Sequence, residues 1–213
     1  MKTKQVISLL SKKNIKIVDE GNIIYHDYRK VANVPLENHD AIILMDGVWK
    51  FCFVELERRN EPDIQVKKSF SSKSDALEHL FLNRLYWHWL FKYVVPNRDS
   101  VDKLWNIDVL REIMKDLSIP EKYLCTPEKL HEKSICVFKK DGKWFEAYIG
   151  TNKQMFESSE EGFDDEDWFF SIRINSIYCL YLLDKYTEEL LKRKKIKVPF
   201  SDIQIANFLG YDI

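Results

Sequence analysis

A dense acidic segment is the part of this chain whose residue types most clearly support a chemical role. The eleven residues from Glu157 to Asp167 carry seven carboxylates and no basic side chain. Carboxylates steer the approach of a basic partner, and a large aromatic side chain supplies contact energy once two surfaces meet. The segment therefore predicts a protein-binding surface. The residues assigned to it are Glu160, Glu161, Phe163, Asp164, Asp165, Asp167 and Trp168.

Two other interpretations of the acidic segment stay open. A long helix is expected over about residues 165–194, and acids in the first turn of a helix stabilise it through the helix dipole. The acids could instead hold a metal ion, although their spacing matches no known calcium loop and no histidine lies nearby. We predict neither a metal nor a cofactor.

A second group of charged side chains recurs at helical spacing. Arg84, His88 and Lys92 follow one another at intervals of four residues in an otherwise apolar, aromatic-rich stretch. This spacing places them on one narrow ridge of a helix. The ridge predicts a solvent-facing stripe on a buried helix; alternatively it binds an anion or pairs with acids from the other half of the chain.

A third group has the residue types of a metal-dependent nuclease. Glu55 lies on one expected strand, and Asp63, Gln65 and Lys67 lie on the next. An acid on one strand beside a Gln-x-Lys step on its neighbour can hold Mg²⁺ and orient a water molecule. The same spacing also arises in any strand pair with charged edges, and the second half of the chain has no equivalent.

No established catalytic motif accompanies these groups. The five histidines are scattered, and the sequence has no GxSxG step, no glycine-rich phosphate loop and no HExxH step. We therefore predict that the protein is not an enzyme. The basic run from Lys192 to Lys197 is interpreted as the electrostatic complement of a helix C-terminus, with nucleic-acid contact as the alternative.

The elements that would position these residues occur in a similar order twice. Asp46-Gly47-Val48-Trp49 and Asp141-Gly142-Lys143-Trp144 each join two apolar runs. Asp-Gly in that setting is typical of a type I′ hairpin turn, which needs positive φ at both central positions. Each hairpin precedes a short strand and a long aromatic helix, the first expected to stop at Pro96. We predict an α+β fold of two similar helix–β-hairpin–strand–long-helix units, residues 1–98 and 99–213, packed as one pseudo-duplicated body.

Composition limits the class of protein. The 213 residues are 45% hydrophobic and 14% aromatic, which suffices for a core. The net charge of −1 provides no general attraction for nucleic acid. The four cysteines form no CxxC pair and are interpreted as small core residues in a reducing compartment. The most apolar stretch contains charges that argue against a membrane span, so a cytoplasmic protein is expected.

At the level of class, the chain resembles the immunity proteins that bacteria pair with secreted polymorphic or contact-dependent toxins. The acidic stretch from Glu157 to Asp167 and the two Asp-Gly-x-Trp hairpins carry the resemblance. It implies tight binding to a cognate toxin domain, often a basic nuclease, and no catalysis by the chain itself. Two alternatives stay open: a Mg²⁺-dependent nuclease-like enzyme, and a non-catalytic structural or phage accessory protein.

Overall fold

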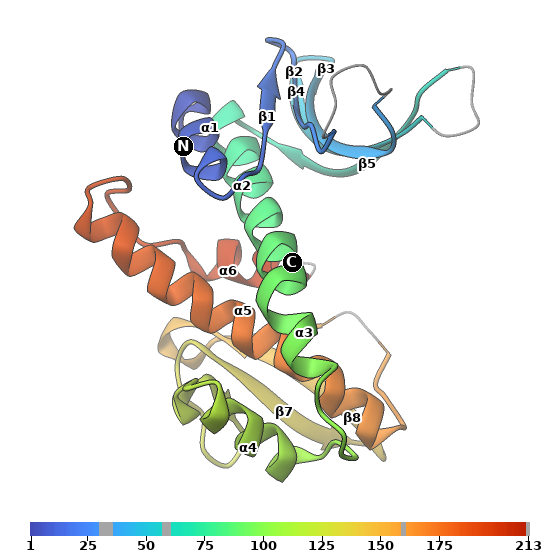
Figure 1. Ribbon diagram of the computed structural model, residues 1–213, viewed down its shortest axis with the longest axis vertical. Helices are drawn as coiled ribbons and strands as arrows, with labels where there is room; N and C mark the ends of the chain where they lie inside the picture. The colour runs from blue at the N-terminus through green and yellow to red at the C-terminus, as the bar shows by residue number, and fades with distance from the viewer. Residues whose placement is uncertain (30–35, 57–60, 159–160, 212–213) are drawn as a thin grey trace. The chain divides into compact units, whose positions relative to one another are not determined.

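The chain folds into two compact units, Met1–Leu85 and Tyr86–Ile213, in the computed structural model (Figure 1). The structure describes residues 1–29, 36–56, 61–158 and 161–211. Both units combine helices with a β-sheet, which confirms the predicted α+β class. Among the described residues, no helix is both long and apolar enough to cross a membrane.

The first unit is built on a five-stranded antiparallel sheet. Its helices and strands are α1 (Thr3–Ser11), β1 (Ile17–Asp19), β2 (Ile23–His26), β3 (His39–Met45), β4 (Val48–Glu55), β5 (Asp63–Phe70) and the first part of α2 (Lys73–Trp89). The strands lie in chain order, and each pairs with the next. Asp46 and Gly47 both have positive φ, 53° and 76°, so the predicted turn between β3 and β4 is confirmed.

The sheet of the first unit buries apolar side chains on both faces. Successive strand residues point to opposite faces. On one face, Phe51 meets His79 of α2 with ring centroids 4.6 Å apart, so this face packs against the helix. On the other face, Ala41, Ile43 and Cys52 belong to a separate buried cluster. Figure 1 shows that β3, β4 and β5 are strongly curled.

The second unit has a four-stranded sheet in the order β6-β7-β8-β9, with β6 parallel to β7 and the other pairs antiparallel. Its elements are the end of α2, the π-helix η1 (Leu90–Val94), α3 (Val95–Arg98), α4 (Ile107–Asp116), η2 (Glu121–Tyr123), β6 (Leu124–Cys125), β7 (Ser134–Lys140), β8 (Lys143–Ile149), η3 (Thr151–Lys153), β9 (Met155–Glu157), α5 (Glu166–Lys192) and α6 (Asp202–Phe208). Helix α5 is a major contributor to the core, and its Phe169, Phe170 and Ile174 are fully buried.

Two predictions about the first long helix differ from the structure. It does not stop at Pro96, because the π-turn Leu90–Val94 shifts the backbone register and Pro96 enters α3 in its first turn, where its missing N–H is not needed. The boundary between units lies at Leu85 and Tyr86 rather than near residue 98. The cause is packing: Trp89 meets Tyr186 of α5 with ring centroids 5.7 Å apart, so the end of the helix belongs to the second core.

The two units share the Asp-Gly hairpin and differ around it. Asp141 and Gly142 repeat the positive φ values of the first hairpin, 50° and 84°. However, β6 has two residues and runs parallel to β7, whereas β2 has four and runs antiparallel to β3. The strand after the hairpin has three residues in the second unit and eight in the first. The predicted duplication therefore stays a prediction.

Candidate protein-binding site

The acidic segment forms the N-terminus of α5. The side chain of Asp165 is the N-cap and accepts a hydrogen bond of 2.9 Å from the backbone N–H of Trp168. Glu166 and Asp167 follow in the first turn, where the helix dipole favours negative charge. The interpretation of these acids as support for a helix N-terminus is thus confirmed, and Asp165 has a structural task.

Two further residues fix this segment to its surroundings. The carboxylate of Asp167 accepts a hydrogen bond from the backbone N–H of Trp105, in the loop before α4. Phe163 forms an isolated bridge with Trp144 of β8, with backbone N–H···O distances of 2.8 and 2.9 Å in the two directions. Asp167 and Phe163 are therefore partly buried anchors, and neither is fully presented to solvent.

The predicted binding residues consequently separate into two groups. Glu161, Asp164 and Trp168 are exposed, and the relative solvent exposure of Trp168 is 57%. Asp165 is also exposed, but its carboxylate caps the helix. Glu160 lies outside the described residues. The exposed group therefore consists of two acids and a large aromatic side chain from the anchored N-terminal end of α5 and the segment before it.

A buried ion pair lies beneath this helix end. Arg173 of α5 pairs with Glu146 of β8, and their side chains are only 5% and 7% exposed. The guanidinium also lies over the rings of Phe163 and Phe169, at 5.3 and 4.8 Å from their centroids. The ion pair therefore contacts the Phe163 ring and links the acidic segment to the sheet.

Sequence reasoning did not single out this ion pair, although a signal for it was present. Trp144, Glu146 and Tyr148 alternate along β8 and therefore share a face of the sheet. Trp144 stacks on Phe169 of α5, with ring centroids 5.7 Å apart, so that face is the buried one. A carboxylate at an inward position of a strand requires a cationic partner, which Arg173 in the apolar part of α5 supplies.

The ridge of Arg84, His88 and Lys92 does not form a continuous solvent stripe. The Arg84 side chain is 12% exposed and pairs with Asp40 of β3, and its Nη1 lies 3.3 Å from Nδ1 of His26. The predicted solvent position is therefore wrong for Arg84, because β3 offers a carboxylate that the sequence spacing could not reveal. Burial, with the nearby Arg84 charge, lowers the pKa of His26 to about 4. Lys92 is exposed and lies over the Tyr93 ring.

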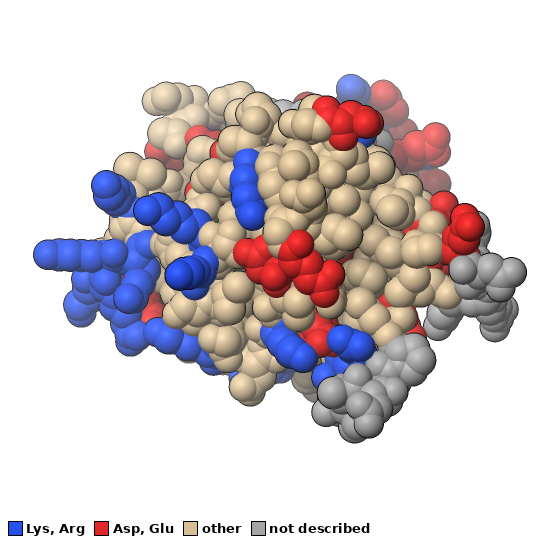
Figure 2. All heavy atoms as spheres, turned by 90° about the horizontal axis from the view of Figure 1, so that it is seen from above, with Lys and Arg blue, Asp and Glu red and all other residues tan. Residues whose placement is uncertain are grey.

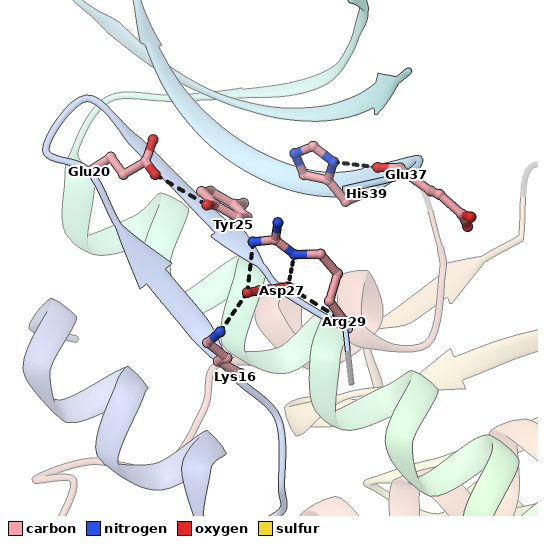
Figure 3. Close-up of polar contacts among 7 residues, drawn as sticks. All are labelled: Lys16, Glu20, Tyr25, Asp27, Arg29, Glu37 and His39. Atoms are coloured by element: carbon pink, nitrogen blue, oxygen red, sulfur yellow. Dashed lines mark hydrogen bonds and ion pairs between the residues drawn. The ribbon is translucent and has the colours of Figure 1, made fainter. Parts of the chain in front are cut away.

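The carboxylate of Asp27, in the first unit, is buried and has hydrogen bonds at all of its acceptor positions. Asp27 accepts hydrogen bonds from Lys16 Nζ at 2.7 Å and from the backbone N, Nε and Nη2 of Arg29 at 3.1, 2.8 and 3.1 Å (Figure 3). These bonds hold the pKa of Asp27 well below its usual range. A carboxylate has about four lone-pair positions, so Asp27 retains none with which to act as a base or a metal ligand. Its role is to fasten the end of β2.

The nuclease-like residues lie on neighbouring strands, as predicted. Glu55 of β4 pairs in register with Asp63 of β5, and a β-bulge next to Phe51 and Cys52 leaves Lys67 outside the register. Lys67 Nζ donates to Gln65 Oε1 at 3.1 Å. The described part of the chain holds no group of three or more His, Cys, Asp or Glu side chains placed to share one metal ion. Nuclease activity stays a prediction.

Basic side chains gather mainly at the left of the face drawn in Figure 2. The face drawn in Figure 2 carries Lys and Arg as well as Asp and Glu side chains. In the basic run after α5, Arg193 pairs with Glu189 at 3.2 Å, one helical turn earlier. This is the pairing expected at a helix C-terminus. Comparisons with protein-family models, with curated proteins and with solved structures return no match to this chain.

Proposed function

We propose that this protein binds a basic protein partner through the N-terminal end of α5, as an immunity protein that neutralises a cognate bacterial toxin domain. The observation that carries the proposal is the exposure of Trp168 at the acidic, anchored N-terminal end of α5. Tryptophan is enriched among the residues that dominate binding energy at protein interfaces.

The anchoring of the segment favours binding. Asp165 caps α5, Asp167 holds the Trp105 amide, and Phe163 is bridged to β8. A surface that is ordered before binding loses less conformational entropy when the partner docks. The exposed acids Glu161 and Asp164 then accelerate the encounter with a basic surface, and Trp168 slows dissociation.

The decisive experiment uses the toxin domain encoded by the neighbouring open reading frame. Calorimetric titration of the two purified proteins is expected to give a 1:1 complex whose affinity falls as salt rises. Trp168→Ala should weaken binding by about 2 kcal/mol or more. The double variant Glu161→Lys/Asp164→Lys should mainly slow association and reduce the dependence on salt.

A matched control carries the same change of charge elsewhere in the second unit. Asp116→Lys/Glu121→Lys reverses two exposed acids at and beyond the end of α4. It should leave the affinity close to that of the unaltered protein. Equal effects of the two double variants would show that only net charge matters, and an unchanged affinity in Glu161→Lys/Asp164→Lys would remove the acidic surface from the interface.

A further inference from the structure

Two cysteines lie side by side in the sheet of the second unit. Cys125, on the edge strand β6, is the registered partner of Cys136 on the parallel strand β7. Adjacent strands are about 4.8 Å apart, which is within the range of roughly 4.4–6.8 Å between Cα atoms that a disulfide spans. Registered partners point to the same face of a sheet, and both side chains join one buried cluster with Ile149. Both thiols are free.

The hydrogen bonds around the pair distinguish the two sulfur atoms. Hydrogen bonding from Cys136, with a smaller effect from Ser134, favours the charged form of Cys125 and lowers its pKa, against the opposing effect of burial. The bond between the two thiols, together with burial, raises the pKa of Cys136. Ser134 Oγ lies 3.1 Å from Cys125 Sγ and 2.6 Å from the carbonyl oxygen of His131. A hydroxyl has one proton, which it can turn toward Cys125 when the thiolate forms.

The other two cysteines differ in this respect. Cys52 lies in the first unit and Cys179 lies on α5, and both are fully buried. Burial is the main cause that raises the pKa of each thiol. A raised pKa keeps a thiol protonated and therefore slow to react with electrophiles. They serve as internal controls within the same chain.

We propose that Cys125 and Cys136 form a redox site that a hydroperoxide converts reversibly into an internal disulfide. The Cys125 thiolate attacks one peroxide oxygen, the O–O bond breaks, and the departing alkoxide or hydroxide takes up a proton, leaving a sulfenic acid. The Cys136 sulfur then attacks Cys125, the S–O bond breaks, and hydroxide leaves as water with the Cys136 proton. In sum, two thiols and one hydroperoxide give one disulfide, one alcohol (or water) and one water.

Access to the pair depends on the segment that connects the two strands. Residues 127–129 and 132–133 are exposed, whereas Leu130 packs against the cysteine cluster. Cys125 lies on the edge strand and is 4% exposed, while Cys136 is fully buried. Cys125 is therefore the more accessible thiol of the pair. This difference agrees with Cys125 as the attacking thiol and Cys136 as the resolving one.

The test treats the reduced full-length chain with hydrogen peroxide and then maps the cysteines by mass spectrometry after alkylation. The expected product has lost two hydrogen atoms, carries the link between Cys125 and Cys136, and regains both thiols on reduction. In Cys136→Ser, dimedone should label Cys125 as a sulfenic acid. In Cys125→Ser, dimedone should label no cysteine. Alkylation of Cys125 should rise at a pH below the value of about 8.5 for an ordinary thiol.

Controls keep the result interpretable if a variant folds poorly. Cys52→Ala and Cys179→Ala should each still form the internal disulfide, which tests the assignment on chains that retain the pair. The urea-unfolded chain shows that the peroxide dose is sufficient. A folded chain that keeps all four thiols under that dose would overturn the proposal. A disulfide that involves Cys52 or Cys179 would also overturn it.

Discussion

Removal of Arg173 tests whether the buried ion pair holds the second unit together. The Arg173 and Glu146 side chains are 5% and 7% exposed, so Arg173→Met leaves the Glu146 carboxylate buried without its cation. Such a loss costs about 3–5 kcal/mol. The guanidinium also leaves the rings of Phe163 and Phe169, which are cation–π contacts of about 0.5–2 kcal/mol. We expect the free energy of unfolding of this unit to fall by about 3–5 kcal/mol.

The double variant Arg173→Met/Glu146→Leu separates charge from packing. Apolar residues of similar volume often replace a buried ion pair without loss of stability. The double variant should therefore recover most of the stability that Arg173→Met loses. The coupling free energy from the full cycle of single and double variants measures the interaction between the two side chains.

Urea unfolding followed by tryptophan fluorescence suits this experiment, because five of the six tryptophans lie after residue 85. Hydrogen exchange at the amides of β8 then localises the effect, since the two units need not unfold together. A loss below about 1 kcal/mol in Arg173→Met, the range of an exposed ion pair, would refute the buried pair. A double variant no more stable than Arg173→Met would refute the charge argument.

Three further changes test other parts of the structure. Burial lowers the pKa of His79 to about 4, so folding opposes its protonation. This histidine alone should lower the stability of the first unit by at most about 3 kcal/mol as pH drops from about 6.5 to 4, and hydrogen exchange should show a flatter pH profile in His79→Leu. Asp27→Asn should lose about 1–3 kcal/mol near neutral pH in urea unfolding. Because the folded chain lowers the pKa of Asp27, this carboxylate stabilises the unaltered protein above about pH 4, and its contribution declines at lower pH. Asp27→Asn should lack that pH dependence. Gly150→Ala would place a Cβ 2.7 Å from Asp202 Cγ. The free energy of unfolding should therefore fall by about 1–3 kcal/mol, seen as a lower melting temperature. An unchanged melting temperature would show that Asp202 moves aside freely.

Local patterns in the sequence predicted local structure well. Both Asp-Gly hairpins and the acidic first turn of α5 are present in the structure. Each depends on residues within one turn of the backbone. The end of the helix at Pro96 was also predicted from a local rule, and that prediction is wrong. The π-turn just before it lets the chain continue as α3, with Pro96 in the first turn of α3.

Contacts between distant residues decided the character of the candidate site. The acids of residues 157–167 look equivalent in the sequence, but Asp167 reaches the amide of Trp105 and is removed from the exposed surface. Arg84 was expected at the surface and is instead paired with Asp40, 44 residues away. The sequence alone determined the α+β class, the hairpins and the acidic helix end, because these depend on neighbours along the chain. The tertiary structure decided which acids stay exposed, where Arg173 and Glu146 meet and which cysteines face each other, because those outcomes depend on strand register and burial.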